Sequence, residues 1–64
     1  MRLHIESMHC GGCARAVTRT IQHIDPQARV DADPPSRKVE VETTAASAAI
    51  TSALEEAGFP AQIE

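Results

Sequence analysis

Aromatic side chains are almost absent from this 64-residue chain, which contains one phenylalanine and no tyrosine or tryptophan. Hydrophobic residues make up 42% of the sequence, but many of them are alanines. A chain of this length lies near the lower limit for folding around one core without disulfides or metals. We therefore expect a single domain over residues 1–64 with a thin aliphatic core. Such a core has no room for an enclosed substrate pocket and a catalytic apparatus, so an enzyme is not expected.

Excess positive charge, long apolar runs and an export signal are also missing. The net charge is −3 and the isoelectric point is about 5.5, which argues against a nucleic-acid partner. The apolar runs are far shorter than a membrane span, so no direct membrane insertion is expected. The first residues, MRLHIES, are too short and too polar for a signal peptide. We therefore expect a cytoplasmic protein, in a reducing compartment where a structural disulfide does not persist.

Two different hydrophobic periods occupy the first part of the chain. Residues 2–6 alternate polar and apolar, which predicts a strand with Leu3 and Ile5 on one face. From Gly12 the apolar residues recur at helical spacing, which predicts an amphipathic helix. Its apolar positions are Ala14, Val17, Ile21 and Ile24. Pro26 disfavours helical geometry at the residue before it and ends this helix.

The same two periods return in the second part. Residues 28–33 and 37–42 alternate again on either side of the turn sequence DPPS, which predicts a hairpin. Thr44 is the expected N-cap of a second helix, and Gly58 occupies the position of a C′ glycine. The apolar stripe of this helix is expected at Ala46, Ala49, Ile50, Ala53, Leu54 and Ala57. The last residues predict a short strand, which Pro60 assigns to a sheet edge.

The resulting order of elements is strand, helix, strand, strand, helix, strand. Two such halves form a four-stranded antiparallel sheet with both helices on one face. The sequence therefore predicts an α+β fold, the ferredoxin-like βαββαβ sandwich. The short linkers indicate no internal domain boundary.

The only two cysteines lie in the sequence MHCGGC, residues 8–13. This stretch follows the first predicted strand and places Cys13 at the start of the first predicted helix. There the unpaired backbone N–H groups and the positive helix end favour a thiolate. The two glycines are expected to let the backbone curl so that both sulfurs point to one spot. A dithiolate in a surface loop suits a soft metal ion.

The chain resembles the heavy-metal-associated (HMA) domain family, which comprises small copper chaperones and the N-terminal metal-binding modules of metal-transporting P-type ATPases. The resemblance covers the whole chain and is closest to the small bacterial CopZ-like copper chaperones. It is carried by MHCGGC at the place of the family's M-x-C-x-x-C motif, by the order of the elements, and by AGF before the last strand.

The resemblance implies that Cys10 and Cys13 bind Cu(I) in near-linear two-coordination. The ion then passes to a similar CxxC on a partner, the metal-binding domain of a copper-transporting P-type ATPase, through mixed three-coordinate intermediates. The ligand count agrees, because Cu(I) accepts two soft ligands whereas structural zinc usually takes four. The chain is expected to be a monomer or a copper-bridged dimer.

Several residues near the cysteines allow two interpretations each. Met8 is expected to pack under the loop, with a thioether ligand as the alternative. His9 is either a solvated imidazole or an auxiliary ligand of the metal. Phe59 stands where bacterial copper chaperones commonly have tyrosine and eukaryotic ones lysine. Without a hydroxyl or a charge it can support the loop only by shielding it from water or by capping the core. Arg15 and Arg19 are either a solvated face or a surface that orients a partner.

Three other functions remain open on the sequence. The same fold can carry mercury, zinc or cadmium, although related mercury-binding proteins need an export signal and zinc transporters often have aspartate at the position of His9. The chain can also be a domain excised from a P-type ATPase. A thiol–disulfide oxidoreductase is less favoured, because the chain is short for a thioredoxin-like fold and has no tryptophan beside the motif.

Overall fold

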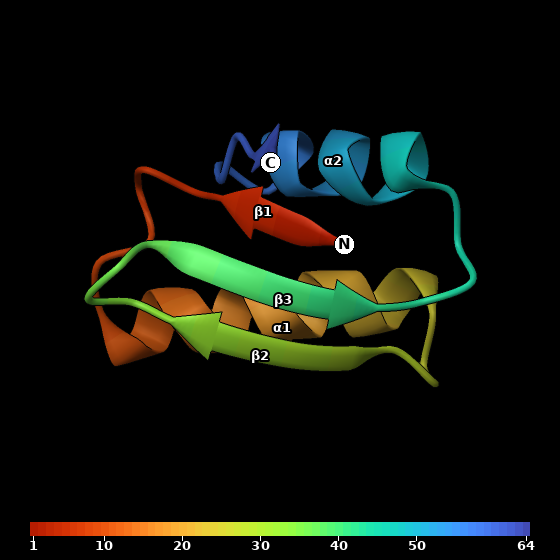
Figure 1. Cartoon of the computed structure of the whole chain (residues 1–64), viewed down its shortest axis with the longest axis horizontal. Coiled ribbons are helices and arrows are strands. Elements are labelled where there is room, and N and C mark those ends of the chain that lie inside the picture. Colours follow the sequence, from red (N-terminus) through yellow and green to blue (C-terminus); the bar gives the residue numbers. More distant parts are fainter.

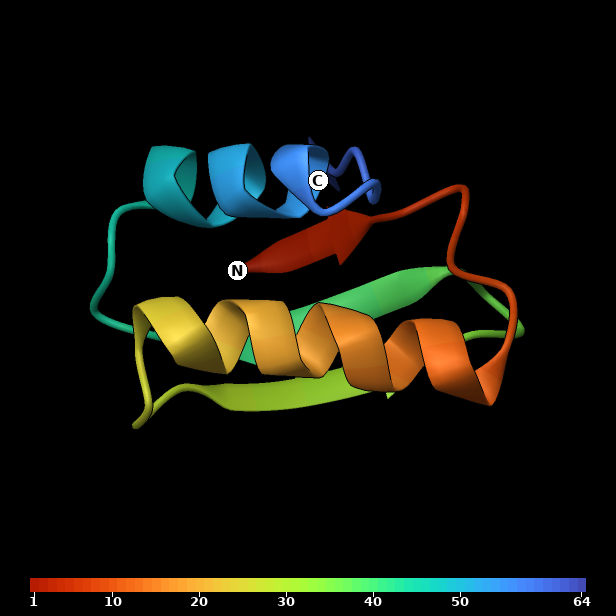
Figure 2. The same cartoon turned by 180° about the vertical axis from the view of Figure 1, so that it is seen from behind.

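The computed structural model describes all 64 residues and contains four strands and two helices. In chain order they are β1 (Arg2–His4), α1 (Gly11–Ile24), β2 (Arg29–Asp33), β3 (Lys38–Glu42), α2 (Ser47–Glu56) and β4 (Gln62–Ile63). The strands form one sheet in the order β2-β3-β1-β4, and every neighbouring pair is antiparallel (Figure 1). Both helices cover the same face of this sheet (Figure 2). The ferredoxin-like fold predicted from the sequence is confirmed.

The core lies between the sheet and the helices. Ten residues are buried, and all of them are hydrophobic: Leu3, Ile5, Met8, Val17, Ile21, Ala28, Val39, Val41, Ile50 and Leu54. The two central strands supply Leu3, Val39 and Val41 at alternating positions, as their period predicts. Neither helix has the length and apolar character needed to span a lipid bilayer.

Helix α1 departs from its predicted pattern at both ends. It begins at Gly11, one residue earlier than expected, because Cys10 takes the N-cap position. Val17 and Ile21 are buried, but Ile24 is 41% exposed, so its assignment to the core was wrong. Ile24 is the last helical residue and lines an open groove with Ala53 and Ala57 of the second helix and its cap. The side chains that line this groove cover Ile24 only in part.

Helix α2, in contrast, begins later than predicted. Its first residue is Ser47 and its N-cap is Ala46, which makes no side-chain capping bond, so Thr44 is not the N-cap. The neighbouring Thr43 instead accepts a hydrogen bond from the Ala45 N–H (3.0 Å) and donates one to Asp25 Oδ2 (2.6 Å). The hydrogen bond from Thr43 to Asp25, the C-cap of α1, therefore favours Thr43 over Thr44 as the residue that bonds the backbone at this turn.

The predicted apolar stripe of α2 is narrower than expected. Ile50 and Leu54 are fully buried and Ala53 is half-buried, whereas the remaining alanines of the stripe, Ala46, Ala49 and Ala57, are exposed. Ala46 and Ala57 are the N-cap and the C-cap of α2, so they lie at the two ends of the helix and not along its packed face.

The C-terminus of α2 follows its prediction closely. Gly58 has a φ of +92°, a left-handed conformation that glycine adopts without steric cost. The Gly58 N–H bonds the Glu55 carbonyl (3.1 Å) and the Phe59 N–H bonds the Leu54 carbonyl (2.8 Å), which is a Schellman motif. The chain then reverses into β4, a two-residue strand at the sheet edge.

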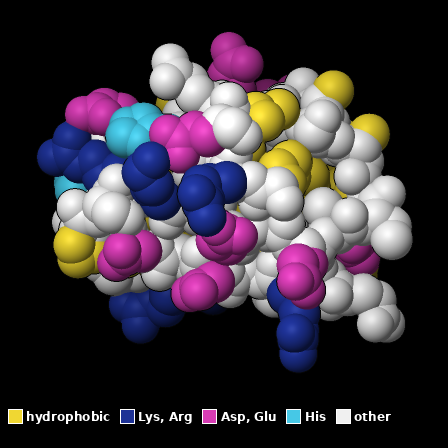
Figure 3. Space-filling view, viewed as in Figure 1, with side chains coloured by type: hydrophobic (Ala, Val, Ile, Leu, Met, Phe, Trp, Pro, Cys, Tyr) yellow, Lys and Arg dark blue, Asp and Glu magenta, His cyan; other side chains and the backbone are white.

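The other face of the sheet carries charged side chains of both signs (Figure 3). Four ion pairs involve the side chains of this face and the turn beside it: Arg2–Glu40, Arg29–Glu42, Lys38–Glu64 and Arg37–Glu6. The Arg29–Glu42 separation is 3.9 Å, so this pair is the loosest of the four. Exposed ion pairs of this kind add little stability each.

Candidate metal centre

The two cysteines occupy the N-cap and the third residue of α1. Cys10 has an extended backbone (φ −145°, ψ 167°), and its sulfur accepts a hydrogen bond from the Cys13 N–H at 3.3 Å. A serine or aspartate N-cap makes the same bond to the third helical residue. Since these two positions lie one turn apart, the C-x-x-C spacing brings both side chains to the same helix end. The two Sγ atoms are 3.0 Å apart.

The Cys10 thiol has a lowered pKa. The largest cause is the hydrogen bond between its sulfur and that of Cys13, followed by the Cys13 backbone N–H. The Gly12 N–H and the positive charge of Arg15 act in the same direction, and partial desolvation opposes them. The first turn of α1 contains no acidic residue, so no carboxylate opposes the thiolate there. The groups around this helix end therefore favour the thiolate form of Cys10.

The two sulfurs differ in their exposure. Cys10 is exposed, whereas Cys13 is half-buried and packs against the hydrophobic core. Both are free thiols. One sulfur of the pair is therefore open to an incoming molecule, and the other is fixed by the helix and the core.

The glycines between the cysteines do not have the role expected of them. Gly11 and Gly12 are the first two residues of α1, and neither has a positive φ. A Cβ atom at Gly11 would meet nothing within 4 Å, and one at Gly12 would lie 3.9 Å from Cys10 Sγ. The sulfurs are brought together by the helix cap rather than by an unusual backbone at the glycines.

The segment that leads into the helix, residues 5–10, is called the thiol loop below. Met8 belongs to the base of this loop and is fully buried in the core, as expected for a side chain that packs under the loop. The Ser7 hydroxyl donates to the Gly58 carbonyl at 3.4 Å, which links the thiol loop to the turn that carries Phe59. Phe59 itself is half-buried against the core. The thiol loop thus has a packed base and an exposed tip at His9 and Cys10.

The side chain of His9 is exposed and takes part in no hydrogen bond or ion pair in this structure. No group of three or more His, Cys, Asp or Glu residues is arranged to hold a metal ion. The donor set that the fold assembles is therefore the pair of sulfurs, Cys10 and Cys13. Two thiolates are a suitable complete ligand set for a soft two-coordinate ion and half of the set for tetrahedral zinc.

Arg15 and Arg19 differ from the other cationic side chains of the protein. The chain has six Lys and Arg residues, and the remaining four are in ion pairs on or beside the open face of the sheet. Arg15 and Arg19 are exposed, form no ion pair, and line an open groove between α1 and β2. The face of α1 that continues from the cysteines therefore carries two cations outside any ion pair, in a chain of net charge −3, and the Asp31 carboxylate of β2 lines the same groove.

One residue of the thiol loop and one residue beside it were not singled out from the sequence. Glu6 lies in the loop, and Arg37 ends the turn between β2 and β3, yet their side chains form an ion pair. Their separation of 31 residues leaves no periodic signal to connect them. The one local hint is that Arg37 closes a DPPS turn, at a place where hairpins commonly need a left-handed residue.

Comparisons with known proteins agree with this geometry. The family model of the heavy-metal-associated domain matches residues 2–60. A gold-binding protein of known crystal structure is 47% identical, with a TM-score of 0.94 over 97% of this chain and 95% of that chain. The copper chaperone Atx1 from Synechocystis PCC6803 is 31% identical, with a TM-score of 0.92 over 97% and 98%. The protein Atu1203 from Agrobacterium tumefaciens is 37% identical, with a TM-score of 0.85 over 94% of each chain. Among curated protein sequences, none matches the chain.

Proposed function

The chain belongs to the heavy-metal-associated domain family, and on that basis we propose that residues 1–64 act as one domain that carries Cu(I). Cys10 and Cys13 hold the ion between their sulfurs. The domain then delivers it to the metal-binding domain of a copper-transporting P-type ATPase in the cytoplasm. It acts as a carrier, and it works as a monomer that a shared copper ion can bridge to a second thiol pair.

The observation that carries this proposal is the pair of sulfurs 3.0 Å apart at the end of α1, with no third ligand group arranged around them. Copper(I) is satisfied by two thiolates, whereas zinc would keep half of its coordination sites for water. The lowered pKa of Cys10 supports the same assignment, because metal binding needs the thiolate form.

The difference in exposure supports an order of events in transfer. An incoming partner thiolate reaches the ion beside Cys10, because this sulfur is exposed. Cys13 releases the ion last, because the helix and the core hold its sulfur in place. The ion stays bound to sulfur throughout and does not need to pass through water.

A competition titration against chelators of known affinity tests the proposal. We expect one Cu(I) per chain and far weaker binding of Zn(II). Cys10→Ser and Cys13→Ser should each abolish tight binding, because one thiolate cannot hold the ion in linear geometry. Met8→Leu is the matched control: the buried thioether is replaced by a side chain of similar volume, and the affinity should stay the same. Zinc binding as tight as copper binding would overturn the assignment.

Gold(I) is a second candidate, and one comparison favours it. The gold-binding protein is 47% identical to this chain, against 31% for the copper chaperone. Gold(I), like Cu(I), is a soft ion that binds two thiolates. The same titration with Cu(I) and Au(I) in competition separates the two ions, and preferential retention of gold would replace copper as the proposed cargo.

A further inference from the structure

Arg37 has a backbone conformation that its residue type rarely adopts. Its φ is +60°, and it is the only residue other than glycine with a positive φ. Hairpin turns of this kind usually place glycine there, because a Cβ atom makes the left-handed region unfavourable. An arginine at this position suggests that its side chain has a task that glycine cannot perform.

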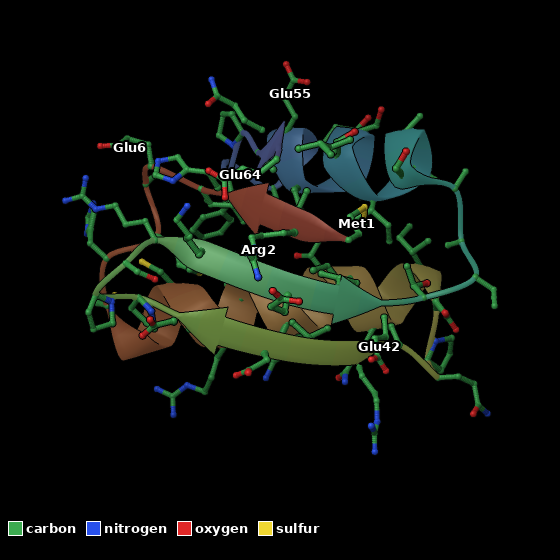
Figure 4. The ribbon with its side chains drawn as sticks, in the orientation of Figure 1. Met1, Arg2, Glu6, Glu42, Glu55 and Glu64 are labelled. Atoms are coloured by element: carbon green, nitrogen blue, oxygen red, sulfur yellow. The ribbon has the colours of Figure 1, made fainter.

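The arginine joins the β2–β3 turn to the base of the thiol loop by two contacts. Its carbonyl accepts a hydrogen bond from the Ile5 N–H at 2.8 Å. Its guanidinium Nη1 lies 2.5 Å from Glu6 Oε1. The other oxygen of the same carboxylate, Oε2, lies 2.7 Å from His4 Nε2 at the end of β1. Glu6 therefore connects the turn, the loop and the central strand, and it lies beyond β1 at the end of the sheet (Figure 4).

Apart from the contacts of Cys10 with the first turn of α1, the contacts of the thiol loop lie at its base. Ile5 and Glu6 are bound to the β2–β3 turn, Ser7 to the Gly58 carbonyl, and Met8 is buried. His9 and Cys10 follow directly and are exposed. The position of Cys10 is therefore set on one side by the helix cap and on the other by this fastened base. A chelating pair of ligands binds more tightly when its atoms are held at the binding distance beforehand.

We propose that Glu6 and Arg37 are positioning residues of the metal centre: their ion pair fastens the thiol loop to the β2–β3 turn, which keeps Cys10 beside Cys13 and slows release of the metal. The inference rests on the proposed function, in which the two cysteines hold Cu(I). Neither residue touches the ion. Both act through the path of the backbone between Glu6 and Cys10.

The test is the rate at which the loaded protein gives up Cu(I) to a chelator, followed by stopped-flow absorbance. Glu6→Gln and Arg37→Gln should each speed release about two- to fivefold, the range expected for one exposed ion pair. The double variant should be no faster than Glu6→Gln alone, because Glu6→Gln already removes the contact that Arg37→Gln removes, together with the contact to His4. Arg37→Lys, which keeps the charge, should restore much of the wild-type rate.

Three comparisons separate this role from a general loss of stability. Glu40→Gln removes a similar exposed ion pair with Arg2, away from the thiol loop, and should leave release unchanged. Arg37→Gly removes the side chain but relieves the left-handed backbone, so it should speed release while the melting temperature stays equal or rises. The differences from wild type should shrink between about 0.01 M and about 1 M salt, where the Debye length falls from about 30 Å to about 3 Å.

The hydrogen-exchange rate of the Ile5 amide in the metal-free protein is a second, independent test of the same contact. Glu6→Gln should speed this exchange, because the Ile5 N–H is the backbone bond that the ion pair protects. Unchanged exchange, unchanged copper release in Glu6→Gln, or additive effects in the double variant would each overturn the inference. A wild-type protein that released Cu(I) as fast as Cys10→Ser would overturn the proposed function itself, and this inference with it.

Discussion

Cys10 combines the positions of helix N-cap and exposed thiol. An N-cap side chain must accept a hydrogen bond from the first turn, and a thiolate does so better than a neutral thiol. The Cys10 Sγ also forms a hydrogen bond with the Cys13 Sγ, 3.0 Å away, and this bond is the largest cause of the lowered pKa of Cys10. The capping interaction that starts α1 and the chemistry of the thiol therefore depend on the same atoms.

This origin of the pKa leads to a prediction for the reduced, metal-free protein. Replacing Cys13 by alanine removes the sulfur that bonds Cys10, so the pKa of Cys10 should rise. A higher pKa leaves less thiolate at neutral pH, and thiolate fraction outweighs the accompanying gain in intrinsic nucleophilicity. Alkylation of Cys10 by iodoacetamide at pH 7 should therefore slow, and its pH–rate curve should move to higher pH.

Mass spectrometry of Cys10 over a pH series provides the measurement. Cys13→Ser is the matched control, because its hydroxyl can still donate to the Cys10 sulfur, and its curve should lie between those of wild type and Cys13→Ala. A curve that does not move in Cys13→Ala would show that the backbone N–H groups, and not the second sulfur, set the pKa.

At the scale of elements, α1 joins the thiols to a charged surface. Arg15 and Arg19 lie on its exposed side, and Arg19 is four residues, about 6 Å of helical rise, beyond Arg15. Both are without the carboxylate partners that the other four cations have. Unneutralised charge next to a transfer site accelerates encounter with an oppositely charged partner more than it changes affinity for the cargo.

We expect Arg15→Glu/Arg19→Glu to leave Cu(I) affinity nearly unchanged and to slow transfer to an acidic partner domain. The difference should shrink as salt is raised, because exposed charges are screened. Stopped-flow exchange at low and high ionic strength is the measurement. Arg2→Glu/Arg29→Glu makes the same change in net charge on the open face of the sheet and should slow transfer less. Equal effects of the two double variants would reduce Arg15 and Arg19 to an ordinary solvated face.

At the scale of the whole molecule, the thiol pair lies at the edge of the hydrophobic core and is not part of it. All ten buried residues are hydrophobic, and neither cysteine is among them. The thiol loop contributes Ile5 and Met8 to the core, and the remaining buried residues lie outside it. We therefore expect the elements to hold together without a metal, unlike small zinc domains that are unfolded without their ion.

The metal-free protein should consequently show the same far-UV circular dichroism as the Cu(I) form. Its melting temperature should still rise on loading, because an ion that binds the native state adds stability by mass action, about 2.7 kcal/mol at a free concentration of 100 Kd. Cys10→Ser should keep the fold and lose this gain. A metal-free spectrum typical of an unfolded chain would mean that the ion is a structural element of the fold.

Much of the fold and the close approach of the two thiols could be predicted because the relevant signals are local. Alternation at Val39 and Val41, helical spacing at Val17 and Ile21, and the glycine at Gly58 each reflect a backbone preference that acts within a few residues. The two cysteines belong to the same class of signal, since their spacing matches one helical turn. The sequence by itself therefore determined the order of the elements, most of the core and the position of the thiol pair.

Only the tertiary structure decided which side chains meet across long separations. The sequence gives no reason to pair Glu6 with Arg37, or Asp25 with Thr43, since each pair comes together only when β1, the hairpin and the helices are in place. The same holds for contacts that do not form: Ile24 has the right period but stays 41% exposed, and Arg15 and Arg19 form no ion pair. Local preference acts along the chain, whereas ion pairs, caps and burial depend on what the fold brings alongside, and that is a property of the packed molecule.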